Sequence, residues 1–314
     1  MKKGLGMIVL LMVAGALLFA GGAKETGAAK KIRFGVTIED FNDVFMRYLL
    51  DQLKDEASKV GAEVIAMDGK RDPNEQIKQI ENFITQKVDA IIIHVIDQTI
   101  APRITKLCND AKIPLVYVNR KPEDQALQGE KVVAVASPEE VAGRLEAEFV
   151  VNKLNGKGNV AILLGTLGSA PQIGRTKGSK EVIAKYPDMK VIREQAANFQ
   201  RPEAVAVVEN WLASGDKIDA IIANNDEMAI GAVLVLEEKK MKDKVVVTGV
   251  DATSDALKFI EEGRLDMTVF QNGGAQGRGA VQAALKMIKG EPVEKFVEIP
   301  FEPVTRENYT KYKK

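Results

Sequence analysis

From residue 31 onward, the chain alternates between short apolar runs and longer amphipathic stretches. The runs "KIRFGVTI", "VDAIIIHVI" and "IPLVYVN" are rich in Val and Ile, which is typical of strands buried on both faces of a sheet. The stretches from Val44 to Val60 and from Asn74 to Gln86 place apolar residues at helical spacing. This alternation predicts a doubly wound α/β fold, in which helices cover both faces of a parallel sheet.

The same alternation begins again near residue 138, so the 314 residues predict two α/β lobes in tandem. The further expected helices are Ala101 to Ala111, Pro138 to Leu154, Arg175 to Lys185, Pro202 to Ala213, Glu227 to Glu238, Ser254 to Glu262 and Ala275 to Lys289. The further expected strands are "GAEVIAMDG", "NVAILLG", "KVIREQ", "IDAIIAN", "KVVVTGVD" and "DMTVFQ", with one last strand, "VEIPFEPV", at residues 297–304.

The first residues predict export from the cytoplasm. "MKK" is a basic segment, and an apolar run that ends in small residues follows it. This pattern is typical of a secretory signal peptide, predicted at residues 1–23, and a flexible leader is predicted at 24–31. An uncleaved membrane anchor is the alternative, because Met7 to Ala23 is at the lower edge of a spanning length.

Composition excludes several classes of protein. The chain has 44 basic and 44 acidic residues, so it offers no electrostatic footprint for a nucleic acid. Its single cysteine and single histidine cannot build the usual zinc site, and no Walker loop or dinucleotide fingerprint is present. Neither a metal nor another cofactor is expected.

Three conspicuous side chains are interpreted as structural. Cys108 falls in a helix-like segment and is predicted to be buried packing. Trp211 lies at helical spacing with valines, which favours the core over stacking on a sugar. His94 stands alone at the end of an apolar run and is interpreted as a core residue or a support for a site.

Polar and aromatic residues gather where predicted strands end. In open parallel sheets, ligands bind at the carboxyl ends of the strands. Strand ends of both lobes contribute, so the expected site is a cleft between the lobes. The residues at these positions are Asp43, Phe45, Asn119, Arg120, Arg175, Phe199, Asn225, Asp251 and Gln271.

Several motifs, in order, resemble the periplasmic sugar-binding proteins of ABC transporters, the ribose- and galactose-binding family with the type I periplasmic fold. They are "FNDVFM", "IPLVYVNRKP", "GRTKG", "ANFQ", "ANNDEMAIGA", "TGVDATSDALKFIEEGRL" and "MTVFQNGGAQG". Each is weak by itself, but together they span residues 32 to 303, which is nearly the whole exported chain.

The resemblance implies a domain organisation in which the chain crosses between the lobes three times. The amino-proximal lobe would comprise residues 32–137 and 272–300. The other lobe would comprise residues 138–271 and 301–314. The helix Ala275 to Lys289 would then return to the first lobe, and the three crossings would form the hinge.

The resemblance also implies that the strand-end residues bind the ligand, with Met46 beside Phe45. Carboxylates accept hydrogen bonds from sugar hydroxyls, guanidinium groups donate to them, and aromatic faces cover the apolar C–H patches. Asn225 is expected to point into the cleft, whereas Asp226 is expected to be the N-cap of the helix that follows. Arg120 and Arg175 are expected to hold Asp43 and Asp251 ionised, which suits binding better than acid catalysis.

The function that the resemblance implies is a solute receptor with no enzymatic activity. It would capture a monosaccharide or cyclic polyol, close by hinge motion and deliver the ligand to an ABC permease, acting as a periplasmic monomer. A pyranose or an inositol is favoured over ribose, because the pair Asn119–Arg120 departs from the pairs of ribose and galactose binders.

A second interpretation keeps the fold and changes the partner. The receptor would then sense a signalling compound and report to a chemoreceptor or a sensor kinase. A ligand-sensing repressor shares the fold, but it would need a DNA-binding helix pair where this chain has the predicted signal peptide.

Overall fold

The computed structural model describes residues 31–313. The predicted signal peptide and all of the predicted leader except Lys31 lie outside these residues, as does Lys314. The strands are β1 Arg33–Ile38, β2 Glu63–Asp68, β3 Ala90–Ile93, β4 Leu115–Asn119, β5 Val132–Ala136, β6 Lys157–Leu164, β7 Asp188–Ala196, β8 Ala220–Ala223, β9 Val246–Asp251, β10 Met267–Gln271, β11 Phe296–Glu298 and β12 Phe301–Val304. The helices are α1 Val44–Lys59, α2 Pro73–Thr85, α3 Ala101–Ala111, α4 Glu139–Lys153, α5 Ala170–Ile183, α6 Arg201–Ala213, α7 Asp226–Glu238, α8 Ser254–Glu261 and α9 Gly273–Lys289.

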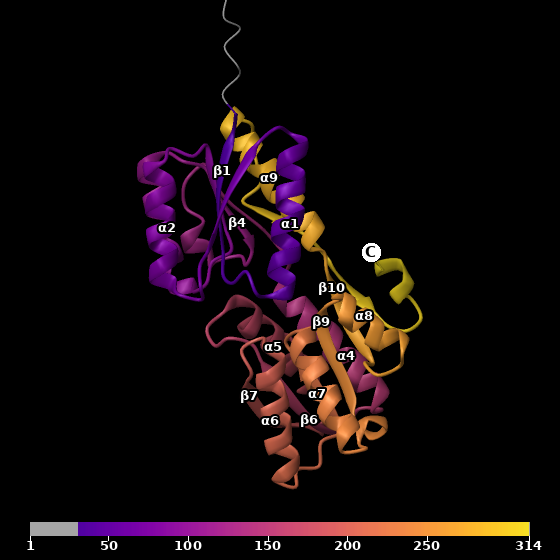
Figure 1. The fold of residues 1–314 in the computed structure, drawn as a ribbon. Coiled ribbons are helices and arrows are strands. Elements are labelled where there is room, and N and C mark those ends of the chain that lie inside the picture. Colours follow the sequence, from indigo (N-terminus) through magenta and orange to yellow (C-terminus); the bar gives the residue numbers. More distant parts are fainter. Residues whose placement is uncertain (1–30, 314) are drawn as a thin grey trace, which may run out of the picture. The chain divides into compact units, whose positions relative to one another are not determined.

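The strands form two six-stranded sheets, shown in Figure 1. The first has the order β11-β5-β4-β3-β1-β2, and the second has the order β12-β10-β9-β8-β6-β7. Neighbouring strands are parallel except β12, which pairs antiparallel with β10. The predicted fold of two α/β lobes is therefore confirmed, with an antiparallel edge strand on the second sheet. We call the first sheet with its helices the first lobe, and the second sheet with its helices the second lobe.

Alternate side chains of the first sheet enter two different cores. On β3, Ile92 packs with α1 and α9, whereas Ile91 and Ile93 pack with α2 and α3. This division follows from the two-residue period of a strand. Because both faces carry apolar side chains, each must be covered by helices, as the near-continuous Val and Ile runs predicted.

The second sheet is built in the same way. Helices α4 and α5 cover one face, and α6, α7 and α8 cover the other. Trp211 lies in the core between α6 and α7, so the core interpretation is confirmed. Cys108 in the first lobe is fully buried, as predicted.

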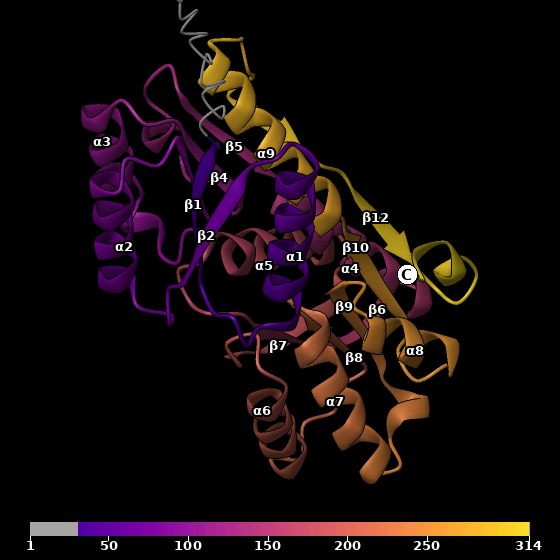
Figure 2. The same ribbon diagram turned by 45° about the horizontal axis from the view of Figure 1, so that its top comes forward.

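The chain passes between the two sheets three times. It crosses between β5 and α4, between β10 and α9, and between β11 and β12. Figure 2 shows α9 beside the first sheet and β12 beside β10. The exact residue boundaries predicted for the lobes stay a prediction.

The structure departs from the predicted elements at three places. The single strand expected at residues 297–304 is divided at Pro300, and its halves pair with different sheets. Strand β5 was not predicted. Helix α5 begins at Ala170 instead of Arg175, because Ser169 caps it and Pro171 lies in its first turn, where the missing N–H of proline costs nothing.

No helix within residues 31–313 combines the length and apolar character needed to span a membrane.

Candidate functional site

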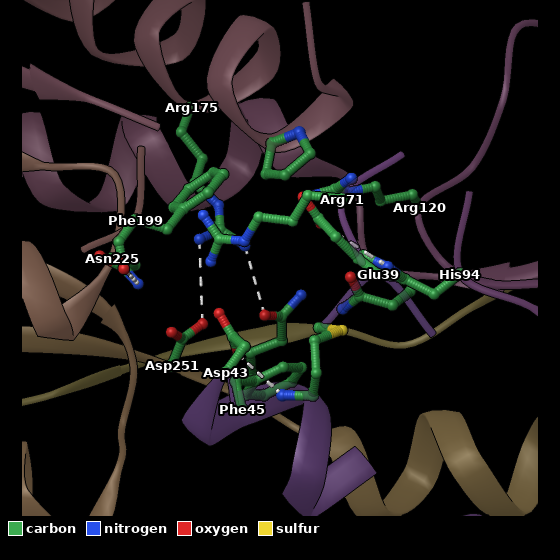
Figure 3. A pocket seen from close by; sticks show the side chains of 14 residues that line it. Glu39, Asp43, Phe45, Arg71, His94, Arg120, Arg175, Phe199, Asn225 and Asp251 are labelled. Carbon is green, nitrogen blue, oxygen red and sulfur yellow. Dashed lines mark hydrogen bonds and ion pairs between the residues drawn. The ribbon is translucent and has the colours of Figure 1, made fainter. Parts of the chain in front are cut away.

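A pocket lies where the carboxyl ends of the two parallel sheets meet (Figure 3). Every residue predicted to bind a ligand lines this pocket, so the structure brings the whole predicted set together. That these residues contact a ligand stays a prediction. The lining residues are Glu39, Asp43, Phe45, Met46, Arg71, His94, Asn119, Arg120, Pro171, Arg175, Phe199, Asn225, Asp251 and Gln271.

The first turn of α1 contributes three of these residues. Asp43 is the N-cap of the helix, and its carboxylate accepts a hydrogen bond of 2.9 Å from the backbone N–H of Met46. Phe45 and Met46 are both buried, and Phe45 also packs edge-on against Tyr48. Asp43 is therefore both the helix cap and a pocket residue, and Phe45 is both a core residue and part of the pocket wall.

Arg120, directly after β4, is held by two hydrogen bonds and an ion pair. Its guanidinium group donates hydrogen bonds of 3.1 Å to the carbonyl oxygens of Val95 and Ile96 and forms an ion pair of 2.6 Å with Glu39. Beside it, Asn119 donates to the side-chain oxygen of Gln276 on α9 at 3.0 Å. With only 3% of its surface exposed, Arg120 is a buried residue of the pocket.

Arg175 connects several polar groups of the second lobe. It forms a 2.7 Å ion pair with Glu139 and donates to the backbone oxygen of Asn224 at 2.6 Å and to the side-chain oxygen of Gln271 at 3.3 Å. A carboxylate oxygen of Asp251 lies 3.8 Å from the guanidinium group of Arg175. Helices α4 and α5, which carry Glu139 and Arg175, pack closely against each other because residue 143 of α4 is a glycine. A Cβ at this position would lie 1.8 Å from the backbone oxygen of Arg175.

Phe199 and Asn225 form the wall opposite the first lobe. Asn225 donates to the backbone oxygen of Phe199 at 3.4 Å. Its side-chain oxygen also accepts a 3.0 Å hydrogen bond from the N–H of Met228, so Asn225 itself is the N-cap of α7. The expectation that Asp226 caps this helix is wrong.

Asp226 is instead fully buried at the first position of α7. Its carboxylate accepts hydrogen bonds from the hydroxyl of Thr268 at 2.6 Å and from the N–H of Thr253 at 2.8 Å. It thus fastens the loop after β9, which carries Asp251, to α7. Burial raises the pKa of Asp226 above its ordinary value.

That the arginines hold Asp43 and Asp251 ionised stays a prediction, and burial acts against it. Burial raises the pKa of Asp43, and the nearby charge of Glu39 raises it further. Burial also raises the pKa of Asp251 well above its ordinary value. Arg120 and Arg175 oppose these shifts without cancelling them, and both arginines also pair with other carboxylates, Glu39 at 2.6 Å and Glu139 at 2.7 Å.

Four lining residues were not predicted as ligand contacts: Glu39, Arg71, His94 and Pro171. Glu39 directly follows β1 and His94 directly follows β3, so the strand-end rule that found Asn119 would have found both. His94 is buried, as interpreted, and burial together with the charge of Arg120 holds its pKa well below the ordinary value. Neutral histidine offers one donor and one acceptor to a ligand.

Arg71 reaches the pocket from the loop after β2. It forms a 2.9 Å ion pair with Asp40 and donates to the backbone oxygen of Asn198 in the second lobe at 3.4 Å. Little in the sequence points to this role, because Arg71 is three residues beyond the end of β2 and its φ of 56° places it in the left-handed region.

Positive backbone φ angles recur around the pocket, at Arg71, Asn119, Phe199 and Asp251. For residues other than glycine, such conformations cost on the order of 1–3 kcal/mol each. They are typical of ligand sites, where the surrounding structure holds a side chain in place against this cost. Among residues 31–313, no cluster of three or more His, Cys, Asp or Glu side chains could hold a metal ion.

Replacing Gly165 with alanine is expected to displace Phe199. A methyl group at position 165 would lie 1.9 Å from the tip of the Phe199 ring. Overpacking of this kind costs about 1–3 kcal/mol of stability, and the displaced ring should weaken ligand binding about tenfold. Unfolding in urea and titration calorimetry measure the two effects.

The double variant Gly165→Ala/Phe199→Leu, which makes room for the methyl group, should regain stability. If the single variant matches the wild type in both measurements, the proposed packing is incorrect.

Comparisons with known proteins agree with this architecture. Residues 34–292 match the family model of the periplasmic binding protein domain. A crystal structure of an ABC transporter solute-binding protein from Bacillus halodurans, with bound myo-inositol, is 42% identical, with a TM-score of 0.86 over 91% of this chain and 99% of that one.

Two other similar proteins cover most of the chain. A protein of Rhizobium meliloti named for rhizopine binding is 40% identical over 91% of this chain and 94% of its own length. A Caulobacter myo-inositol-binding protein, solved with myo-inositol, is 28% identical, with a TM-score of 0.84 over 89% of this chain and 95% of that one. The family match, which extends over most of the described lobes, shows that this chain belongs to the periplasmic binding protein domain family.

Proposed function

We propose that this protein is the solute-binding component of an ABC importer and that it captures a cyclic polyol or a monosaccharide between its lobes. The observation that carries the proposal is the pocket itself. Strand ends of both lobes place charged and amide side chains around it, and Phe45 and Phe199 supply aromatic surface. This is the chemistry that recognises a ring bearing hydroxyl groups.

The raised pKa values of Asp43 and Asp251 support a neutral, hydroxyl-rich ligand. A carboxylate that is buried without enough hydrogen-bond donors favours its protonated form. A ligand hydroxyl that donates to it would supply the missing hydrogen bond, and such bonds to charged groups are worth about 1.5–3 kcal/mol. Among the candidates, we favour myo-inositol or another cyclic polyol over ribose, because two similar solved proteins hold myo-inositol.

Delivery of the ligand to the permease is proposed to follow closure of the two lobes about the hinge. Three chain crossings connect the lobes, and a ligand that contacts both lobes stabilises the closed state by its differential affinity. The protein would act in the periplasm, outside the cytoplasmic membrane, with an ABC permease as its partner and without catalysis. Coupling to a chemoreceptor or a sensor kinase would use the same pocket and stays a prediction.

A thermal-shift screen of residues 24–314 tests the ligand class. The panel is myo-inositol, allose, glucose, galactose, xylose and ribose, together with amino acids and nucleosides as other classes. A ligand at 100 times its dissociation constant should stabilise the protein by about 2.7 kcal/mol, which corresponds to a few degrees in melting temperature. We expect a shift with myo-inositol or a monosaccharide.

Two variants locate the binding site in the same screen. Asp251→Asn should lose most of the shift, since Asp251 lines the pocket. Asp255→Asn, whose side chain is 62% exposed outside the pocket, should keep it. Shifts with amino acids or nucleosides only would overturn the proposed ligand class, and equal shifts in the two variants would overturn the proposed site.

A further inference from the structure

A second cavity adjoins the ligand pocket, and we call it the side chamber. It lies between the first two turns of α1 and the segment that joins β9 to α8. Val44 and Tyr48 form its wall on the first lobe, and Ser254 and Leu257 form its wall on the second. Tyr312, near the end of the described chain, closes one side.

The side chamber and the ligand pocket share two walls, Phe45 and Asp251. Figure 3 shows both residues on the same side of the pocket. Asp251 is only 7% exposed, and its carboxylate accepts no hydrogen bond from the described part of the chain, with Arg175 as its nearest cation at 3.8 Å. A buried acceptor without a donor stands where the two spaces meet, which makes the border itself a place to bind a ligand oxygen.

The free space is larger in the side chamber than in the ligand pocket. The cavity volume is about 110 Å³ in the chamber and about 40 Å³ in the pocket. One water molecule needs about 10–15 Å³ on this measure, so the chamber has room for a substituent of several heavy atoms. A ligand confined to the pocket would leave the side chamber unfilled.

The walls of the side chamber combine aromatic and aliphatic side chains with the hydroxyl groups of Thr253 and Ser254. Phe45 and Tyr48 pack with ring centroids 6.3 Å apart, and Tyr312 packs against Phe270 at 4.8 Å. Leu257 is buried behind them, and Asp251 at the border is the one ionisable carboxyl or amino group among the lining residues. Aromatic and aliphatic walls of this kind hold apolar groups, which gain free energy in proportion to the surface that they bury.

We infer that the ligand is a cyclic polyol or monosaccharide that carries an O-linked alkyl or aryl group, and that this group occupies the side chamber. The ring lies in the ligand pocket, and a ring hydroxyl next to the substituted carbon donates a hydrogen bond to the carboxylate of Asp251. This inference rests on the proposed function, since the ring must bind before its substituent can be placed.

Titration calorimetry with substituted ligands tests the inference. The probes are the mono-O-methyl and mono-O-benzyl ethers of myo-inositol and the methyl and phenyl pyranosides of glucose, galactose and allose. Each is compared with its unsubstituted parent. We expect one regioisomer to bind at least as tightly as the parent, because its substituent replaces water on an apolar surface.

Filling the side chamber should then separate the two kinds of ligand. Ser254→Trp places an indole at the exposed mouth of the chamber, and the substituted ligand should lose about tenfold or more in affinity while the parent changes little. Ser254→Ala, which leaves the chamber open, should bind both as the wild type does. Val44→Trp fills the chamber from the opposite wall and repeats the test if Ser254→Trp does not fold.

The outcomes distinguish the inference from the proposed function. If the parent binds but every ether and glycoside loses most of its affinity, or if Ser254→Trp and Val44→Trp weaken parent and substituted ligand equally, the side chamber holds no part of the ligand. If neither a parent nor a substituted compound binds, the proposed function is wrong and the inference is overturned with it.

Discussion

Replacing Arg175 with methionine is expected to weaken ligand binding about 100-fold and to destabilise the protein by about 3–5 kcal/mol. Arg175 holds Glu139, Gln271 and the backbone oxygen of Asn224 through hydrogen bonds of 2.6 to 3.3 Å. Methionine keeps the length of the side chain but leaves the carboxylate of Glu139 buried without a cation. Breaking one partner of a buried pair costs far more than the pair contributes.

Double variants separate the two effects of Arg175. Arg175→Met/Glu139→Gln should regain most of the lost stability, because no buried charge is left without a partner, but it should not regain binding. Arg193→Met is the matched control, since Arg193 pairs with Asp216 at the surface with 45% of its side chain exposed. Surface pairs of this kind contribute about 0–1 kcal/mol. Urea unfolding measures the stability and titration calorimetry measures the affinity. Wild-type stability in Arg175→Met would show that Arg175 does not hold these groups together.

The free energy of unfolding is expected to fall as pH rises from about 5 to 8, and Glu146 is expected to cause about 1.4 kcal/mol of this fall per pH unit. Glu146 on α4 is fully buried. Its carboxyl accepts one hydrogen bond, of 2.9 Å, from Thr248, and its other oxygen has no partner within the described residues. Burial raises the pKa of Glu146 to about 8, with Arg175 opposing the shift and Asp226 adding to it.

The direction of the pH effect follows from which state holds the proton. Between its ordinary pKa and about 8, Glu146 is protonated in the folded protein and ionised in the unfolded chain. The folded state therefore binds one more proton than the unfolded state, and raising the pH favours unfolding. Below the ordinary pKa, both states are protonated and Glu146 has no effect on the slope.

Unfolding in urea at pH 5, 6, 7 and 8 measures this slope. Glu146→Gln, which stays neutral throughout, should flatten it by about 1.4 kcal/mol per pH unit. Glu148→Gln, on the exposed side of the same helix, leaves the buried acid in place and should keep the wild-type slope. An unchanged slope in Glu146→Gln would show that Glu146 does not hold the proton.

The elements of the fold were largely predictable because their patterns are local. Helix α3 was predicted with its observed bounds, and α1 to within one residue. The errors have local causes as well. Strand β5 follows a turn-rich segment, and helix α5 begins earlier than expected because its cap, Ser169, precedes a proline in the first turn. Asn225 and Asp226 are both good N-caps, so composition could not choose between them.

The pocket was predictable in its position and incomplete in its membership. Residues at the ends of strands, such as Asn119 and Asp251, line the pocket because all carboxyl ends of a parallel sheet meet at one edge. Glu39 directly follows β1 and fits the same rule, although it was not among the predicted residues. Arg71 obeys no such rule, since it reaches the pocket through an irregular loop.

The sequence alone determined the α/β fold and the edge of each sheet at which a ligand would bind, because hydrophobic period and strand direction are properties of neighbouring residues. Only the tertiary structure decided the charge pairs. Arg120 pairs with Glu39 and Arg175 with Glu139, and Asp251 accepts no hydrogen bond from the described residues. Burial raises the pKa of Asp251 well above its ordinary value. Ionisation depends on burial and on distances of a few ångströms between residues far apart in the chain, and no local pattern carries that information.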